Sequence, residues 1–347
     1  MSQFTGKIAG EGFDDLILPR LGAARHEIVQ GAAFGVDVSV IDIGGGTGLA
    51  MTSDPLSWIP SLGLAESAWL SVHLMANDMA TTGFAPMYAQ MVLNLPPDAG
   101  EHDFKIYWEN VHRYCKAIGV SITGGHTGSI EGQNSTIAGG GTMMLTAPLD
   151  KILLSNRAQA GDLIIVTKEC AISSTAILAM SFPQTVIQKL GREVYQNACE
   201  LFYQTSSLPE ALAAAQTRQL TAMHDVTEGG VLGAAVEMAK ASSLGLRIYD
   251  EHLPKGFAQE QIAALFGIDT RFCVGAGAMI MAVKKGQEQV VKATLAGQNI
   301  RATVIGEFTL PETGCQLITE GQAAAVPYFE KDPYWAAYFN AYKNGWE

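Results

Sequence analysis

The chain has 347 residues, of which 48% are hydrophobic and 16% are charged. This length exceeds one ordinary hydrophobic core, so we expect two domains, and the apolar content excludes a disordered protein. The formal net charge is −12, without a cluster of lysines and arginines, which argues against binding to nucleic acid or to an anionic membrane. Anionic substrates would therefore need a local site built from a cation or from helix N-termini.

No targeting or membrane-spanning segment is expected. Residues 1–20 lack a charged start followed by an apolar run, which argues against a signal peptide. No stretch reaches the roughly 18 consecutive apolar residues that a spanning helix needs. Five widely spaced cysteines without a CxxC pair are typical of free thiols in a reducing compartment. The sequence therefore predicts a cytoplasmic protein that does not enter a membrane.

The first half of the chain alternates predicted strands and helices. Residues 36–43 and 49–53 flank Gly44-Gly45-Gly46, a pattern that predicts a β-hairpin. The elements expected after this hairpin are helices over 65–82 and 102–118 and strands over 87–95, 120–123 and 137–146, with a glycine-rich loop between the last two strands.

A domain boundary is expected between residues 148 and 161. The apolar run at 162–167 is typical of a strand that is buried on both faces. Further strands are expected over 220–224, 246–248, 278–283 and 303–308, and helices over 173–180, 186–203, 209–216, 231–242 and about 287–297. The sequence thus predicts an α/β (α+β) protein with domains at 1–150 and 151–320.

The last segment, residues 321–347, is rich in aromatic side chains. Tyr334, Tyr338 and Tyr342, with Trp335 and Phe339, follow the spacing of one helix face. We expect this helix to pack onto the body of the protein or across a dimer contact, and covering a ligand is the alternative.

Two aspartates stand where a carboxylate often has a function. Asp54 follows a predicted strand, and ligands of α/β proteins tend to bind at strand ends. Asp78 lies beside Asn77 in an otherwise apolar helix, where a charged group needs a partner. Each also has a simpler interpretation, because Asp54 precedes Pro55 and can form a turn, and the helix around Asp78 can open to solvent.

Two glycine-rich motifs are suited to binding an anion. Gly124-Gly125-His126-Thr127 follows a predicted strand, where glycines allow close backbone approach and Thr127 offers a hydroxyl; an ordinary hairpin turn is the alternative. In His224-Asp225-Val226-Thr227-Glu228-Gly229-Gly230 the glycine pair begins a helix, whose N-terminus attracts phosphate, although Glu228 can serve only as a cap. Mg²⁺ favours a few carboxylates together with substrate phosphates, so the whole series of motifs favours a Mg²⁺–phosphate site.

Taken in order, these motifs resemble the superfamily of aminoimidazole ribonucleotide synthetase. Its members include selenophosphate synthetase, thiamine-monophosphate kinase and the hydrogenase maturation protein HypE, and the resemblance is closest to the HypE-like, AIR synthase-related branch. The matching segments are GKI at 6–8, FGVDVSVI at 34–41, TSDPLSWIP at 52–60, MANDMATTGFAP at 75–86, SITGGHT at 121–127, GDLIIVTK at 161–168, STAILA at 174–179 and HDVTEGGVLGA at 224–234.

The resemblance implies a PurM-like fold in which ATP and Mg²⁺ bind between an N-terminal domain that dimerises through its sheet and a C-terminal domain. It implies attack of an oxygen of a small molecule or a protein carboxamide on the ATP γ-phosphate, with Asp54 and Asp225 as catalytic residues. The implied metal ligands are Asp37, Asp54, Asp78 and Asp225, and the implied nucleotide contacts are Asp37, Asn77, Gly124, Gly125, Thr127, Thr227, Gly229 and Gly230.

The chain departs from the family pattern in ways that favour an alternative function. Val36 replaces the first of two acids, His126 stands where many members have Asp, and Ala276 stands where Glu is usual. The loop at 169–174 lacks glycine, and the printed chain ends in Trp346-Glu347, whereas HypE proper ends in a cysteine. A nucleotide-binding scaffold that has lost part of its metal site is therefore the second hypothesis, and an unrelated two-domain α/β protein is the third.

Overall fold

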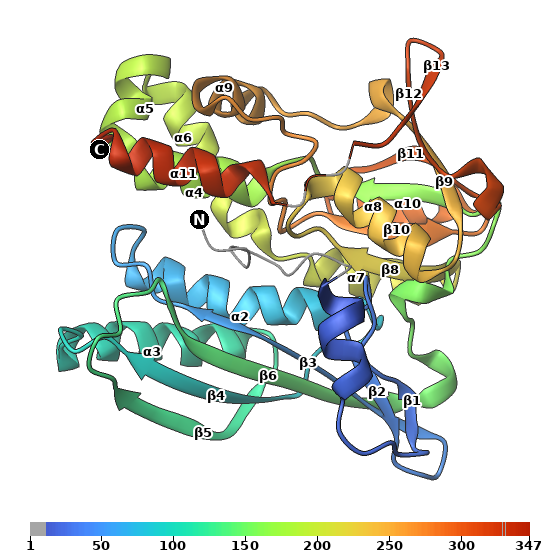
Figure 1. Ribbon diagram of the computed structural model, residues 1–347, viewed down its shortest axis with the longest axis horizontal. Coiled ribbons are helices and arrows are strands. Elements are labelled where there is room, and N and C mark those ends of the chain that lie inside the picture. Colours follow the sequence, from blue (N-terminus) through green and yellow to red (C-terminus); the bar gives the residue numbers. More distant parts are fainter. Residues whose placement is uncertain (1–11, 328, 330) are drawn as a thin grey trace.

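The computed structural model describes residues 12–327, 329 and 331–347, so the predicted GKI segment at 6–8 lies outside the described residues. The chain forms a mixed α/β structure around two sheets. In Figure 1 the N-terminal sheet lies at the bottom, helix α2 (Leu64–Ala80) lies above it, and the C-terminal half lies on top. Helix α2 is therefore placed between the two halves.

Within the described residues, the N-terminal sheet has six strands in the order β1-β2-β3-β6-β4-β5. Neighbouring strands are antiparallel except for β4 and β5, which are parallel. The hairpin predicted around the three glycines is confirmed as β2 and β3. The strands are β1 (Ile28–Gln30), β2 (Ser39–Asp42), β3 (Thr47–Ser57), β4 (Tyr88–Leu95), β5 (Ser121–Ser129) and β6 (Ile137–Pro148).

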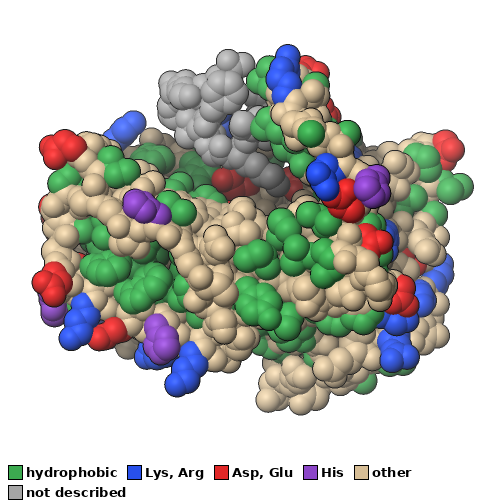
Figure 2. All heavy atoms as spheres, turned by 90° about the horizontal axis from the view of Figure 1, so that it is seen from below, with side chains coloured by type: hydrophobic (Ala, Val, Ile, Leu, Met, Phe, Trp, Pro, Cys, Tyr) green, Lys and Arg blue, Asp and Glu red, His purple; other side chains and the backbone are tan. Residues whose placement is uncertain are grey.

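One face of this sheet is covered and the other is open. Side chains alternate between the two faces of a strand, and along β4 the buried positions such as Met91 pack with Met75 of α2 in one core. The alternate positions Tyr88 and Val92 are each 42% exposed. Helix α3 (Glu101–Ala117) completes the covered face. Figure 2 looks from below and shows hydrophobic side chains across the middle of this side, with charged side chains nearer its edge.

The C-terminal sheet has seven strands among the described residues, in the order β13-β12-β9-β11-β7-β10-β8. Strand β7 lies between β10 and β11 and is almost fully buried, as the apolar run at 162–167 predicts. The strands are β7 (Leu163–Thr167), β8 (Leu220–Asp225), β9 (Gly245–Tyr249), β10 (Met279–Val283), β11 (Ala302–Thr309), β12 (Cys315–Thr319) and β13 (Gln322–Ala325).

The helices of the C-terminal half differ from the prediction at two places. The single helix expected over 186–203 is divided, because Gly191 adopts a φ of +88° that ends one helix before the next begins. Helix α9 was not predicted. The helices are α4 (Ile172–Ser181), α5 (Pro183–Leu190), α6 (Arg192–Glu200), α7 (Leu208–Gln216), α8 (Gly230–Ala241), α9 (Phe257–Phe266), α10 (Glu288–Ala296) and α11 (Pro333–Lys343).

The remaining helical segments of the described chain are short, of three to five residues each. They are a π-helical turn at Phe13–Ile17 and 3-10 turns at Leu18–Arg20, Leu149–Lys151, Ser155–Arg157, Phe202–Thr205, Asp250–His252 and Pro311–Thr313. Across the described ranges, none of the helices has both the length and the apolar character needed to cross a membrane.

Helix α2 is tied to the C-terminal half by buried hydrogen bonds. The side chain of Asn77 donates to the Thr205 carbonyl at 2.9 Å and accepts from the Ser207 N–H at 2.8 Å. Trp69 donates from its indole nitrogen to Thr205 Oγ1 at 2.9 Å. Both ends of the Asn77 amide are therefore used in holding the two halves together, and the contact of Asn77 with nucleotide stays a prediction.

Helix α11 packs onto the body of the chain, which is one of the two uses predicted for the aromatic segment. Tyr334, Trp335 and Tyr338 join a hydrophobic cluster with residues of α4, α6 and α9. At the other end of α11, the Thr185 N–H donates to the carbonyl of Glu347 at 2.7 Å. The helix is thus anchored along its length.

Candidate functional site

Four predicted aspartates approach one another from different elements. Asp54 lies on β3 and Asp78 on α2, while Asp225 ends β8 in the C-terminal half and Asp37 precedes β2. Strand β3 continues to Ser57, so Asp54 lies within the strand and not at its end as predicted. Even positions of β3 face α2, which places Asp54 on the same side as Asp78.

The electrostatics of Asp78 show how close these charges are. Burial raises the pKa of Asp78 well above its ordinary 3.8, and the negative charges of Asp225, Asp54 and Asp37 raise it further. A hydrogen bond from Thr52 Oγ1 to Asp78 Oδ2, 2.8 Å long, acts in the opposite direction. Carboxylates that repel one another in this way favour a bound proton or a bound cation.

The carboxylate of Asp37 is held by hydrogen bonds from residues of the C-terminal half. His224 Nδ1 lies 2.7 Å from Asp37 Oδ1 and 2.8 Å from Oδ2, and Ser155 Oγ donates to Oδ2 at 2.8 Å. The loop before β2 is packed closely here, because a Cβ on Gly35 would lie 2.7 Å from the carbonyl oxygen of Glu237. These contacts fix the carboxylate of Asp37 against β8 and α8.

His224 is buried between two carboxylates. Its side chain is only 3% exposed, and its Nε2 lies 3.3 Å from Oε2 of Glu237 on α8. Burial alone would lower the pKa of His224, but Asp37 and Glu237 together outweigh it and raise the pKa well above 6.5. A proton on this ring offsets part of the negative charge of the two carboxylates beside it.

The N-terminus of α8 binds a carboxylate from the C-terminal segment. The Gly229 N–H, predicted to face a phosphate, donates to Asp332 Oδ2 at 2.8 Å. The carbonyl of Thr227 accepts the N–H of Gly230 at 3.2 Å, which closes the turn. Gly230 needs its glycine because a Cβ would lie 2.6 Å from the Arg271 carbonyl. The anion at this helix start is thus a carboxylate of the protein itself, and contact of Gly229 and Gly230 with a phosphate stays a prediction.

We expect Asp332→Ala to lower the free energy of unfolding by about 2 kcal/mol, because Asp332 caps two helices at once. Its other oxygen, Oδ1, accepts the Tyr334 N–H at 2.8 Å and begins α11. Calorimetry at neutral pH should show a melting temperature a few degrees lower, with no shift for the exposed control Asp98→Ala. Equal melting temperatures for Asp332→Ala and the parent would contradict this double capping role.

The predicted glycine loop at 124–127 is instead part of a strand. Gly124, Gly125 and Thr127 lie within β5, an edge strand that β6 and β4 separate from β3. Gly125 has a φ of +146°, and a Cβ there would lie 1.8 Å from the Met91 carbonyl oxygen. Close pairing with β4 therefore explains this glycine. Contact of the motif with nucleotide stays a prediction.

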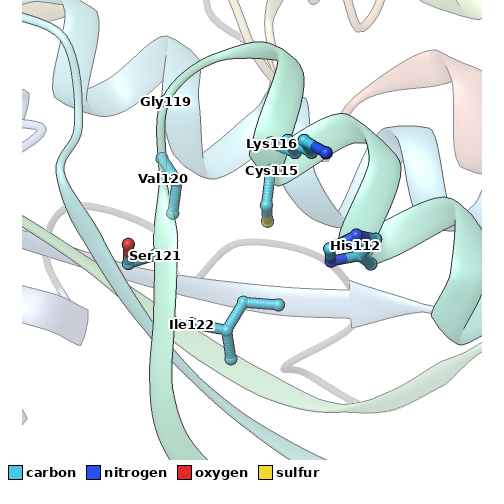
Figure 3. Close-up of a pocket in the computed structure, with 7 residues that line it drawn as sticks. All are labelled: His112, Cys115, Lys116, Gly119, Val120, Ser121 and Ile122. Carbon is cyan, nitrogen blue, oxygen red and sulfur yellow. The ribbon is translucent and has the colours of Figure 1, made fainter.

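A separate hollow of about 460 Å³ lies between the end of α3 and the start of β5 (Figure 3). None of the predicted site residues lines it; its lining residues are His112, Cys115, Lys116, Gly119, Val120, Ser121 and Ile122. Burial raises the pKa of the Cys115 thiol to about 12, and the same holds for Cys170 in the loop after β7. Burial therefore disfavours the nucleophilic thiolate form of both cysteines.

Comparison with known proteins identifies the family. The N-terminal domain of AIR synthase related proteins matches residues 35–144, and their C-terminal domain matches residues 159–314. The chain belongs to the AIR synthase related family. Each of the two matched segments contains most of one sheet, without β1, β12, β13 and the end of β6, and so the predicted PurM-like fold is confirmed.

Relatives of this AIR synthase related protein include enzymes with different names. Carbamoyl dehydratase HypE of Bradyrhizobium diazoefficiens is 25% identical over 72% of this chain and 70% of its own length. Selenide, water dikinase of Escherichia coli is 25% identical over 82% of this chain and 85% of its own length. These relatives support an enzyme of the ATP-dependent phosphoryl-transfer or dehydratase type.

Two solved structures share the fold. A ThiL protein complexed with AMPPCP and TMP has a TM-score of 0.71 at 16% identity, covering 94% of this chain and 98% of the other. The hydrogenase maturation protein HypE in complex with ATP has a TM-score of 0.65 at 18% identity, covering 94% of each chain. At this identity the likeness concerns the fold of this AIR synthase related protein.

Several residues of this AIR synthase related site were not singled out from the sequence. His224 was part of a noted motif, but Glu237, Ser155 and Asp332 carried no local signal. The one available sign was a histidine at the end of an otherwise apolar strand, because such a buried ring needs a polar partner. Its partner Asp37 lies 187 residues away, which no local pattern could reveal.

Proposed function

We propose that this protein is an ATP- and Mg²⁺-dependent enzyme that phosphorylates or activates a small molecule or a carboxamide. The observation that carries the proposal is the convergence of Asp54, Asp78 and Asp225 from two sheets and a helix. Such a set of oxygen donors is suited to Mg²⁺, which binds through a few carboxylates and completes its shell with phosphate oxygens and water. The relatives named above support ATP as the phosphate donor.

The residues present fit a Mg²⁺ ion. Asp78 is oriented by Thr52, and Asp225 is held at the end of β8 by pairing with Met279 on β10. We propose that these two carboxylates and Asp54 hold the ion, with Asp37 beside them. Bound Mg²⁺ would neutralise charge on the phosphates during transfer of the γ-phosphoryl group. The proposal assigns no covalent nucleophile to the protein.

Calorimetric titration with Mg²⁺ and the ATP analogue AMPPCP tests the proposal. We expect binding in the micromolar range with one nucleotide per chain, and much weaker binding when EDTA removes the metal. No binding at millimolar concentration would contradict the proposed function. Binding without ADP release in the presence of any candidate acceptor would instead favour the nucleotide-binding scaffold.

We further propose that two copies pair through the open face of the N-terminal sheet and that the protein acts in the cytoplasm. Tyr88, Val92, Met87 and Ile137 expose between 38% and 48% of their surface on or beside β4 and β6. An apolar sheet face is usually covered by another protein surface. All five cysteines lie in the described part and are unpaired, which suits the predicted reducing compartment.

We expect the double variant Tyr88→Glu/Val92→Glu to be a monomer, because like charges buried at the centre of an apolar interface repel one another and lack partners. The dimer dissociation constant should rise about 100-fold or more. Sedimentation equilibrium measures this, with Phe257→Glu as the control, since Phe257 is 65% exposed in the C-terminal half. A parent protein that is already monomeric at micromolar concentration would refute pairing through this face.

A further inference from the structure

The side chain of Lys168, directly after β7, ends among four oxygen atoms of the C-terminal half. Its ammonium group donates to the carbonyls of Gln204 at 2.9 Å, Ser206 at 2.6 Å and Gly277 at 2.9 Å. Oε1 of Glu210 is the fourth oxygen, 2.8 Å from Nζ. These four oxygens form an oxygen cage. An ammonium group has only three N–H donors, so the cage surrounds the charge much as ligands surround an ion.

The oxygen cage is largely closed to solvent and needs a positive charge. The side chains of Lys168 and Glu210 are 14% and 1% exposed. Oε2 of Glu210 is buried and, within the described residues, has no hydrogen-bond partner. Burial raises the pKa of Glu210, and the Lys168 ammonium group opposes that rise. Because a buried carboxylate is strongly unfavourable once its partner is removed, an empty cage would attract another cation.

The backbone of Lys168 indicates that its side chain is retained for its charge. Its φ is +56°, a left-handed conformation that favours glycine. Strain of this kind persists where the surroundings require it, commonly at functional positions. Carbonyl oxygens can also replace the hydration shell of K⁺. We propose that the oxygen cage is a site for a monovalent cation, that the Lys168 ammonium group fills it as a tethered ion, and that K⁺ or NH₄⁺ binds there when this group is removed.

The segment at 204–206 that closes the oxygen cage is also bound by helix α2. Nδ1 of His73 lies 2.9 Å from Ser206 Oγ, and Asn77 bonds to the backbone on either side of Ser206. Asn77 is next to Asp78, one of the proposed Mg²⁺ ligands. The lysine is therefore a positioning residue that acts on Asp78 through this segment. That effect rests on the proposed function, whereas the cation site itself does not.

Lys168→Gly tests the site, because glycine removes the ammonium group and suits this backbone conformation. Thermal melts compare chlorides of K⁺, NH₄⁺ and N-methylglucammonium at equal ionic strength. In N-methylglucammonium, a cation too large for the oxygen cage, the variant should melt several degrees below the parent. K⁺ or NH₄⁺ at about ten times its dissociation constant should raise the melting temperature of the variant by about 2–4 °C. The parent should melt at the same temperature in all three salts.

Two further variants separate a specific site from a general salt effect. Lys168→Met keeps most of the side-chain volume and removes the charge, so it leaves no room for an ion and should not respond to K⁺. Arg218→Gly is the matched control, because Arg218 is exposed and also has a positive φ, of +59°. It should be as insensitive to K⁺ as the parent.

Anomalous scattering from Rb⁺ gives a direct measurement. Crystals of Lys168→Gly in RbCl should show one peak between the carbonyls of Gln204, Ser206 and Gly277, and crystals of the parent should show none there. The proposal is overturned if the peak is missing in Lys168→Gly, if K⁺ does not stabilise that variant, or if Lys168→Met responds to K⁺ equally.

Calorimetric titration with Mg²⁺–AMPPCP measures the effect on the nucleotide site. Lys168→Gly should bind it about 10-fold more weakly in N-methylglucammonium than in K⁺. Equal affinities in the two salts would refute the positioning role. A parent that binds no Mg²⁺–AMPPCP, together with a Lys168→Gly variant that responds to K⁺, would end the proposed function and leave the cation site standing.

Discussion

Asp225→Asn is expected to weaken binding of Mg²⁺–AMPPCP about 100-fold, the largest loss of any single substitution in this protein. Asp225 is 3% exposed and lies near both Asp78 and His224. The amide has the same shape but no charge, so the loss would measure the carboxylate and not a packing defect. Calorimetric titration with and without Mg²⁺ separates the metal contribution from that of the nucleotide.

The control for this substitution is Asp98→Asn, which removes one negative charge from an exposed turn. It should bind Mg²⁺–AMPPCP as the parent does, because screened surface charges contribute little at this distance. Binding of the metal-free nucleotide should be similar in all three proteins. If Asp225→Asn binds Mg²⁺–AMPPCP as tightly as the parent, Asp225 is not a metal ligand and the ligands of Mg²⁺ have to be sought among other residues.

Asp78→Asn is expected to stabilise the metal-free protein while removing its response to Mg²⁺. The pKa of Asp78 is raised by burial and by three neighbouring carboxylates, so its ionised form is unfavourable in the folded state. An asparagine can still accept the hydrogen bond from Thr52 Oγ1 and has no charge. We expect the free energy of unfolding to rise by about 1–2 kcal/mol above neutral pH. Such a gain is typical where function requires like charges to be placed together.

The pH dependence of this gain has a definite sign. The folded state holds the Asp78 proton more tightly than the unfolded chain, whose carboxyl has a pKa near 3.8. The free energy of unfolding of the parent therefore falls as the pH rises from about 4 to the raised pKa that Asp78 has in the folded state. Asp78→Asn has no carboxyl group at this position and lacks this loss. Thermal melts across this range should show the two curves separating as the pH rises. Parallel curves would refute the strain attributed to Asp78.

Addition of Mg²⁺ should make the parent more stable than Asp78→Asn, the reverse of the order expected without metal. A cation neutralises the cluster in the parent and raises its melting temperature by mass action, whereas the variant has lost one ligand. Melting in millimolar Mg²⁺ with AMPPCP measures this crossover. If Mg²⁺ raises the melting temperature of the variant as much as that of the parent, Asp78 lies outside the metal site.

Local sequence patterns were sufficient to predict most of the strands and helices of the fold. The apolar run at 162–167 predicted a strand buried on both faces, and β7 lies between β10 and β11 inside the sheet. Alternation on both sides of three glycines likewise predicted the hairpin of β2 and β3. These features depend on neighbouring residues, so periodicity in the sequence contains the necessary information.

The glycines at 124 and 125 show where a local pattern has two physical meanings. Glycine allows a backbone to approach a phosphate, and it equally allows a close approach between strands. The contact of Gly125 with the Met91 carbonyl favours the second use in this chain. Asp54 is a similar case, since Pro55 suggested the end of a strand. Strand β3 nevertheless continues beyond Pro55. Strand β2 pairs only with residues 48–51 of β3, so at Pro55 only β6 pairs with β3, and a proline is tolerated where one edge of a strand is unpaired.

The sequence by itself determined the α/β class, the order of the motifs and the acids that form the candidate site, because each is written in residues close together along the chain. Only the tertiary structure decided the partners of those acids: His224 for Asp37, Glu237 for His224, and Asp332 for the start of α8. Asp332 and Gly229 are 103 residues apart, and Asp37 and His224 are 187 apart. Hydrogen bonds between such distant residues depend on how the two halves pack, which no short pattern encodes.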